Sequence, residues 1–474
     1  MLLPSLVSNR PRRPTMHKDI SWSYAPYKPY FHETGDIYIC RVAPSETAIH
    51  LEWLPVADTY EIYYRLRNTD TFTLYEATAG CACTITGLTA ETDYEFYVSS
   101  GALRSRIRLA RTGASVGTVV NYLHPDDEAY AFSGRYLCSP SLVRHPNGYL
   151  LTSMDLFAGN APQNLTLIFR SDDEGATWHY VSEVMPAFWG KLFIHRGDLY
   201  LLACSTEYGD LLIGKSTDGG KTFPEHTVLL RGACKCNMPG VHKNPQNVVH
   251  YKGRIYETLE WGSWSCGYHA PMVMSAAKDA DLMDAASWHF TPPLKYDPSW
   301  PGVAKGPSTG NIEGTLAVSP DGRLLNIMRY DTSKTEPKYG LILAYEVNTE
   351  DPDAPLTYSH AIEFPANLSK FMIQYDPVSE SYYSIVSRIT EPDKIRARNL
   401  LSLMVSKDLI HWEVARDLLD YRDHDANDVG FQYVDFMIKG NDILYLCRTA
   451  MNGAHNYHDA NYQTFHRIEN FRDL

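Results

Sequence analysis

The chain has 474 residues, of which 44% are hydrophobic and 21% charged, so it is a globular protein long enough for two domains and not a largely disordered one. Its 43 basic and 56 acidic side chains leave a formal net charge of −13, which disfavours nucleic-acid binding through general basicity. No apolar run approaches the ~18 residues that a membrane span requires, so we expect no membrane partner.

Nine cysteines lie scattered among apolar segments. An odd number without regular spacing is typical of a reduced protein rather than a disulfide-stapled one. The apolar stretch Met1–Val7 is too short for a signal sequence, and Arg10, Arg12 and Arg13 follow it instead of preceding it. We therefore expect a cytoplasmic protein in which residues 1–34 form an N-terminal extension.

Residues 35–114 are predicted to form a small β-sandwich. Three segments alternate apolar and polar residues, as half-buried strands do. These segments are Ala48–Trp53, Tyr60–Arg65 and Thr92–Val98. The order Trp53, a Tyr-rich strand, and Leu88 six residues before Tyr94 resembles a fibronectin type III domain. That resemblance implies a tyrosine corner at Leu88 and Tyr94. We expect this module to be an appendage or a binding platform without chemistry of its own.

Residues 115–474 repeat short strands separated by Gly- and Asp-rich turns. Ser171–Trp178 and Ser216–Phe223 both read Ser-x-Asp-x-Gly-x-Thr-aromatic, and Ser406–Trp412 is a degenerate third copy. Each copy follows an apolar strand, so each is predicted to be a hairpin turn. In such a turn the Asp carboxylate accepts backbone N–H groups, glycine takes a positive φ, and the aromatic side chain packs between sheets.

These segments resemble the Asp-box (BNR repeat) of sialidase-like β-propellers. The 45-residue spacing from Ser171 to Ser216 suits one four-stranded blade. Residues 115–474 would then form six blades of about 60 residues or seven of about 51. The predicted fold is all-β, a β-propeller of six or seven four-stranded blades preceded by a small β-sandwich. Asp-boxes lie on the outer rim, so they indicate the fold and not the chemistry.

The segment Asn311–Arg329 contains the first candidate site residues. It reads as a strand, an Asp-Gly turn and a second strand, with Glu313 near the start and Arg329 at the end. It resembles a sialidase segment with a Glu before one strand and an Arg at the end of the next. The resemblance implies that Glu313 polarises a Tyr nucleophile and that Arg329 grips a substrate carboxylate. The alternative for each is a surface ion pair at a strand end.

A second candidate cluster lies near the C-terminus. Gln432, Tyr433 and Asp435 belong to one predicted strand, on which Tyr433 and Asp435 share a face. Arg448 ends the next apolar strand, much as Arg329 does. Further on, the seven residues 455–461 hold two His, one Asp and two Asn, and the candidates among them are His455, His458 and Asn461. Histidine and tyrosine could supply base and acid; the alternative is a hydrogen-bonded closure of the ring.

A third cluster flanks the predicted hairpin Val248–Leu259. Gln246, Asn247 and Glu260 would lie near the mouth of the central channel. Trp261 belongs to an aromatic-rich loop that could stack on sugar rings or pack between blades. Four nearby residues are of types that ligate zinc, namely Cys234, Cys236, His242 and Cys266. Because Cys-x-Cys is not the usual zinc knuckle, we expect neither a metal nor a cofactor.

Asp155 follows an early strand of the predicted propeller. Sialidases carry their acid/base Asp on a loop early in the propeller, so the resemblance implies Asp155 as a candidate by position. Arg144, in Arg-His-Pro, is similar to the first arginine of the sialidase Arg-Ile-Pro motif, with His in place of Ile.

Three functions are compatible with these residues. The first is an exo-acting glycoside hydrolase of the sialidase-like superfamily that removes a terminal sugar, acidic or neutral, from an oligosaccharide. The second is a lyase acting at glucuronate, of the rhamnose–glucuronate type, with Arg or Asn/Gln neutralising the carboxylate and a His/Tyr pair as base and acid. The third is a non-catalytic propeller that binds glycan or protein. We favour the hydrolase, with an oligosaccharide or glycan as its partner.

Overall fold

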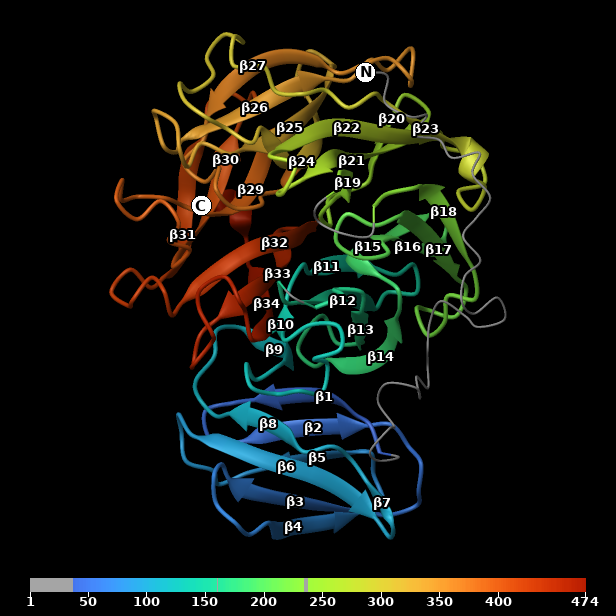
Figure 1. The fold of residues 1–474 in the computed structure, drawn as a ribbon, viewed down its shortest axis with the longest axis vertical. Helices are drawn as coiled ribbons and strands as arrows, with labels where there is room; N and C mark the ends of the chain where they lie inside the picture. The colour runs from blue at the N-terminus through green and yellow to red at the C-terminus, as the bar shows by residue number, and fades with distance from the viewer. Residues whose placement is uncertain (1–36, 160, 234–237) are drawn as a thin grey trace.

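The computed structural model describes residues 37–159, 161–233 and 238–474 (Figure 1). The extension predicted for residues 1–34, together with Cys234 and Cys236, lies outside the described residues. Strands dominate the described chain, and only the short 3-10 turns Ala285–Ser287 and Phe471–Asp473 in it are helical. None of the helices found in these ranges has the length and apolar character to cross a membrane.

The N-terminal part of the described chain is a β-sandwich of two antiparallel sheets, drawn in blue in Figure 1. One sheet has the order β1 (Ile39–Pro44), β2 (Ile49–Trp53), β5 (Ala82–Ile85). The other has the order β4 (Thr73–Thr78), β3 (Tyr60–Leu66), β6 (Asp93–Ser100), and β6 also pairs with β7 (Leu103–Arg104) and β8 (Arg108–Arg111). Leu88 and Tyr94 are buried, and the Tyr94 hydroxyl accepts the Thr89 N–H at 3.0 Å. Membership of the fibronectin type III family remains a prediction.

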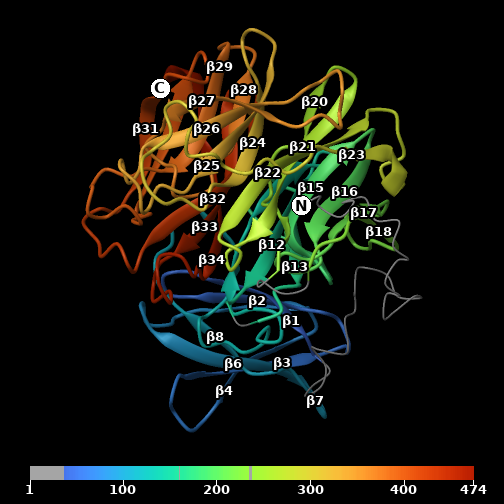
Figure 2. The ribbon, with the colours of Figure 1, turned by 45° about the horizontal axis from the view of Figure 1, so that its top comes forward.

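The rest of the described chain forms six antiparallel sheets, which are the blades of a propeller (Figures 1 and 2). Blade one contains β10 (Tyr136–Leu137), β11 (Ser141–Arg144), β12 (Leu150–Phe157), β13 (Thr166–Ser171) and β14 (His179–Val184). Blade two contains β15 (Phe188–His195), β16 (Asp198–Cys204), β17 (Leu211–Ser216) and β18 (His226–Leu230). Blade three contains β19 (Gly240–His242), β20 (Val249–Tyr251), β21 (Arg254–Ser263), β22 (Tyr268–Ala277) and β23 (Trp288–Phe290).

The second half of the ring is more regular. Blade four contains β24 (Asn311–Val318), β25 (Leu324–Tyr330), β26 (Leu341–Glu346) and β27 (Thr357–Glu363). Blade five contains β28 (Ile373–Asp376), β29 (Ser381–Ser387), β30 (Leu400–Ser406) and β31 (Glu413–Asp420). Blade six contains β32 (Gly430–Lys439), β33 (Asp442–Ala450) and β34 (Tyr462–Ile468), and its outer strand is β9 (Thr118–Tyr122). The described sequence therefore has six blades, closed by pairing of the early strand β9 with the late strand β34.

The sandwich is anchored at this closure. Arg41 on β1 is buried, and its Nε donates to the Val120 carbonyl of β9 at 2.7 Å. One of its Nη atoms is paired with Glu52 at 2.7 Å. A guanidinium bonded to both the carboxylate and the closing strand fixes the sandwich against blade six.

The three Ser-to-aromatic segments connect the third and fourth strands of blades one, two and five. In the first, Asp173 accepts the Thr177 N–H at 2.8 Å, and Ser171 accepts the Gly175 N–H at 2.8 Å. Gly175 has φ +92°, and a Cβ there would overlap the ring of Phe465. This turn therefore requires glycine both for its backbone and for its contact with blade six.

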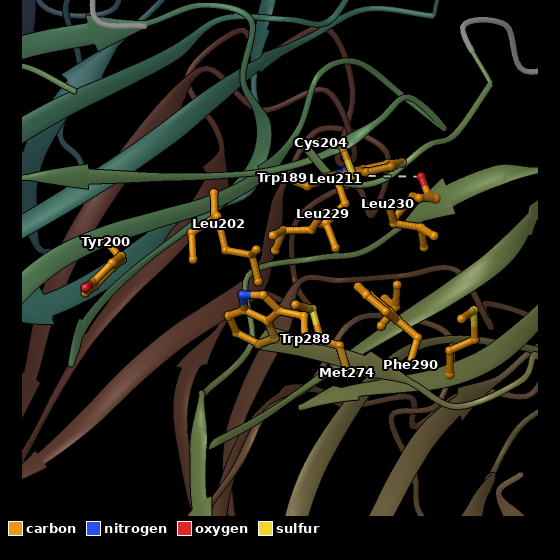
Figure 3. Close-up of a cluster of buried hydrophobic side chains, with 14 of the residues drawn as sticks. Trp189, Tyr200, Leu202, Cys204, Leu211, Leu229, Leu230, Met274, Trp288 and Phe290 are labelled. Carbon is orange, nitrogen blue, oxygen red and sulfur yellow. Dashed lines mark hydrogen bonds between the residues drawn. The ribbon is translucent and has the colours of Figure 1, made fainter. Parts of the chain in front are cut away.

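Apolar layers between neighbouring blades form the core. Figure 3 shows the layer between blades two and three, where Trp288 and Met274 of blade three pack with Leu202 and Leu211 of blade two. These four side chains are at most 5% exposed. Apolar side chains therefore fill the space between these two blades.

Candidate functional site

Three inner strands carry a β-bulge at the same end of the channel. The register shifts lie at the starts of β15, β24 and β32, in blades two, four and six. At each bulge a non-glycine residue takes a left-handed backbone, namely Trp189 (φ 54°), Glu313 (φ 58°) and Tyr433 (φ 57°). Such conformations cost about 1–3 kcal/mol each and cluster at functional sites. A bulge also changes the direction of a side chain relative to a regular strand.

Tyr433 and Glu313 meet at this end of the channel. The Tyr433 hydroxyl donates to Glu313 Oε1 at 2.7 Å, and Arg329 Nη1 donates to Glu313 Oε2 at 2.5 Å. Burial alone would raise the pKa of Glu313, but Arg329, His242 and the Tyr433 hydrogen bond hold it below its ordinary value. Burial and the Glu313 charge raise the pKa of Tyr433 to about 12. The site therefore holds an ionised carboxylate that can accept the proton of a neutral phenol.

Two more arginines surround the Tyr433 ring. The guanidinium carbon of Arg448, near the end of β33, lies 5.0 Å from the ring centroid, and that of Arg398 lies 5.7 Å from it. Burial lowers the pKa of Arg398 to about 10; Tyr433 opposes this, while Arg329 and Arg448 add to it. The positive charges of Arg329 and Arg448 thus repel that of Arg398.

This arginine cluster has more positive than negative charge. Arg329 pairs with Glu313, whereas in the described ranges Arg398 and Arg448 have no carboxylate partner. Arg398 donates to the Gln432 side chain and the Leu368 carbonyl. Arg448 is 1% exposed, and its Nε is without a hydrogen-bond partner in the part of the chain described. Because buried unpaired cations are costly, this arginine cluster favours an anionic ligand.

Gln432, Asn461 and Asp435 support the surrounding structure. Gln432 holds Arg398 and donates to the Tyr457 carbonyl at 2.6 Å. Asn461 bonds both the N–H and the C=O of Met451. Asp435 is 1% exposed and pairs with Lys191 Nζ at 2.6 Å. The side chains of Gln432, Asn461 and Asp435 therefore form hydrogen bonds and an ion pair within the protein.

His455 and His458 bracket Asp459 beside the arginine cluster. Each ring places its Nδ1 2.8 Å from an Asp459 oxygen. The His458 carbonyl accepts from Arg448 Nη2 at 2.5 Å. Burial and the Arg448 charge lower the pKa of His458 to about 4, so its ring is neutral at neutral pH. This segment positions Arg448, and the neutral His458 ring is not a general acid at neutral pH.

Asp155 lies behind the bulge of blade two. Its Oδ1 accepts from Thr166 Oγ1 at 2.6 Å and from the Gly190 N–H at 3.3 Å. It is fully buried, and burial raises its pKa to about 7. Arg144 lies away from the arginine cluster and pairs with Glu174 at 2.6 Å. Instead, Arg448 approaches the end of blade one, where its Nη1 lies 3.3 Å from Cys138 Sγ.

Gln246 and Asn247 join blade three to blade five. Their side-chain amides donate to the carbonyls of Phe371 (2.8 Å) and Ile373 (2.9 Å). Trp261 is 8% exposed and belongs to the apolar layer between blades two and three. These three residues therefore contribute to packing between blades.

Glu260 of blade three borders the bulge of blade four. It binds His242 Nδ1 at 2.6 Å and accepts the Gly314 N–H at 3.2 Å, beside the bulge of blade four. The His242 ring lies 4.2 Å from the Trp189 ring, and it lies 5.2 Å from that of His269. No group of three metal-ligating side chains occurs within the described ranges. The wall formed by blades two and three is thus aromatic and imidazole-rich.

Sequence reasoning missed several residues of this site. Arg398 lies outside any strand and in no recognisable motif. The sequence pattern indicates His242 only as a zinc ligand, and Tyr208 and His269, which share a 3.1 Å hydrogen bond, carry no motif. The aromatic-rich loop after Trp261 was the only local signal for this wall.

Comparison with known proteins establishes the fold of this chain as a sialidase-like β-propeller. No protein-family model matches the sequence, and no curated protein matches it. Among solved structures it is similar to an α-L-arabinanase of Penicillium chrysogenum complexed with arabinobiose, at 15% identity and a TM-score of 0.50, covering 76% of this chain and 99% of that one. It is also similar to the α-L-arabinofuranosidase Arb93A of Fusarium graminearum, at 14% identity and a TM-score of 0.51, covering 74% and 98%.

A third similar structure spans the sandwich as well as the propeller. It is a leech intramolecular trans-sialidase complexed with 2,7-anhydro-Neu5Ac, at 10% identity and a TM-score of 0.50, and the match covers 93% of this chain and 92% of that one. At such low identities these likenesses define the fold and do not assign the activity.

Proposed function

We propose that this protein is an exo-acting glycoside hydrolase that removes a terminal acidic sugar from an oligosaccharide. The observation that carries the proposal is the 2.7 Å hydrogen bond from the Tyr433 hydroxyl to Glu313, enclosed by three arginines of which two have no carboxylate partner in the described ranges. The known activities of structurally similar propellers, which act on arabinose or sialic acid linkages, are consistent with a carbohydrate substrate.

The geometry supports a covalent mechanism at Tyr433. With its pKa near 12 the phenol is a weak nucleophile while it keeps its proton, so attack requires that Glu313 take that proton. The phenolic oxygen then bonds to the anomeric carbon as the glycosidic bond breaks, and the leaving oxygen takes a proton from a second group of the pocket. Water later cleaves the glycosyl–tyrosine bond, so the anomeric configuration is retained.

The arginine cluster supports an acidic substrate. A carboxylate beside Tyr433 would give Arg398 and Arg448 the negative partner that the described chain does not provide. Charge-assisted bonds of this kind are about twice as strong as neutral ones and hold the sugar in one orientation. A neutral sugar would leave both guanidinium groups buried without compensation.

The test is turnover of a panel of sialylated, glucuronate-containing and arabinose-containing oligosaccharides, read by product mass and by the ultraviolet absorbance of an unsaturated uronate. We expect release of an acidic monosaccharide with gain of one water and without that absorbance, and loss of turnover in Tyr433→Phe. Tyr97→Phe, on the sandwich, is the matched control. Cleavage with the absorbance would make the protein a lyase, and binding without cleavage would make it a glycan-binding propeller.

A further inference from the structure

Departure of the leaving group requires a proton donor in the pocket. Such a donor must reach solvent or substrate, must be free of a strong cationic partner, and must be protonated while Glu313 is ionised. Most carboxyl groups near the pocket fail one of these conditions. Asp155 is fully buried, and Glu260 is 1% exposed and bound to His242. The two histidines that flank Asp459 lower its pKa to about 2 against the effect of burial, so it is ionised.

Glu207 meets these conditions. It lies between β16 and β17 of blade two and is half-buried, so part of the residue is exposed to solvent. Its Oε2 accepts a 3.1 Å hydrogen bond from Gln163 Nε2 of blade one. The partner is a neutral amide, which orients the carboxyl without forcing it to ionise. Burial raises the pKa of Glu207 above its ordinary value, although His242 and Gln163 partly oppose this.

The backbone beside Glu207 is fixed against the wall that faces Glu313. Tyr208 forms an antiparallel bridge with Val241, the residue before His242. Its hydroxyl lies 3.1 Å from His269 Nε2, and its ring centroid lies 5.8 Å from that of His242. His242 lowers the pKa of both Glu207 and Glu313, so both carboxyl groups lie near one imidazole.

We propose that Glu207 is the acid/base residue of the site, which rests on the proposed glycosidase function. In the first step its proton passes to the glycosidic oxygen as that oxygen leaves, while Tyr433 bonds to the anomeric carbon and gives its proton to Glu313. In the second step the Glu207 carboxylate takes a proton from water. The water oxygen bonds to the anomeric carbon as the bond from that carbon to the Tyr433 oxygen breaks, and the released phenolate regains its proton from Glu313.

The opposite environments of the two carboxyl groups support these roles. Arg329 binds Glu313 and favours its ionised form, whereas Glu207 has a neutral partner and a partly desolvated site. Environments that separate the pKa values of two carboxyl groups assign the base to one and the acid to the other. Gln163 is then a positioning residue.

The experiment compares Glu207→Gln with the wild type on two acidic glycosides of the same sugar, one with an alkyl leaving group and one with a dinitrophenyl leaving group. We expect kcat/KM for the alkyl glycoside to fall by about 10²–10⁴, because acid catalysis contributes this much, and the dinitrophenyl glycoside to keep nearly its full rate of glycosylation. The basic limb of the pH profile should also disappear. Glu225→Gln, exposed on the same blade, is the matched control and should change neither rate.

A second variant gives an independent test. Azide added to Glu207→Ala should restore turnover of the dinitrophenyl glycoside and yield a glycosyl azide of retained configuration. Equal losses on both leaving groups, or no loss on the alkyl glycoside, in a variant of unchanged melting temperature would overturn the assignment. If Tyr433→Phe is inactive while Glu207→Gln behaves as wild type, only this inference fails. If the wild type cleaves neither glycoside, the proposed function fails and this inference with it.

Discussion

Replacing Arg448 by Met tests whether the arginine cluster binds the carboxylate of an acidic sugar. Arg448 is fully enclosed, yet only its two terminal nitrogens have partners, the Cys138 sulfur at 3.3 Å and the His458 carbonyl at 2.5 Å. Its Nε has none among the described residues. A substrate carboxylate would therefore gain one or two charge-assisted bonds, about 1.5–3 kcal/mol each, and their loss should lower kcat/KM by about 10²-fold.

The assay compares kcat/KM for an acidic glycoside and for its neutral carboxamide analogue in wild type and Arg448→Met. We expect the 10²-fold loss on the acid and a loss of less than about tenfold on the amide, since a neutral amide gains less from a guanidinium. Arg388→Met serves as the control, because that arginine pairs with Asp417 on the outer part of blade five. Equal losses on both substrates would show that Arg448 only supports the His458 segment, and would refute its role in charge recognition.

Three further predictions concern stability and pH. Asp435→Asn leaves the Lys191 ammonium buried without its partner, so the free energy of unfolding should fall by about 3–5 kcal/mol in denaturant titrations. Unchanged stability together with abolished turnover would instead make Asp435 catalytic. Because the pKa of Glu313 is lowered, kcat/KM should be constant at mildly acidic pH and should decline only as the pH falls through that lowered pKa. A decline at or above the ordinary carboxyl range would contradict an ionised Glu313 paired with a cation. Gly175→Ala should lower the melting temperature, because the new methyl group would overlap Phe465 and the backbone is left-handed there, and an unchanged temperature in calorimetry would contradict the requirement for glycine.

The fold could be predicted from the sequence because its signals are local. Period-2 alternation and the repeated turn at Ser171 and Ser216 specify strands and hairpins within a few residues of each other. The number of blades could not be predicted, since it depends on how blades pack side by side. The closure of the ring could not be predicted either, because it pairs β9 with β34 across 340 or more residues of sequence.

Part of the candidate site could be predicted, Glu313 and Arg329 from a resemblance and Tyr433 and Arg448 from the pattern of the C-terminal strands. Glu313, Arg329, Tyr433 and Arg448 were named separately and lie together around one phenol ring. Arg398 joins them from a loop that has no motif. The direction of the Glu313 and Tyr433 side chains could not be predicted, because each residue lies at a left-handed bulge and a regular strand would point its side chain elsewhere.

Other candidate residues had the right chemistry but are used within the protein. The amides of Gln246 and Asn247 are bonded to backbone carbonyls more than 120 residues away in blade five. Asp435 and Glu260 are paired with Lys191 and His242. A polar residue beside an apolar strand can face either the channel or a neighbouring blade, and its partner is decided by tertiary contacts that a single sequence does not contain.

In the proposed mechanism Tyr433 attacks the anomeric carbon of an acidic sugar. The most direct measurement is intact-protein and peptide mass spectrometry after incubation with fluorinated sialosyl and glucuronosyl fluorides, which slow the second step more than the first. We predict one covalent glycosyl group, located on the peptide that contains Tyr433, and none in Tyr433→Phe. Turnover of acidic oligosaccharides without such an adduct, and retained activity in Tyr433→Phe, would contradict the account.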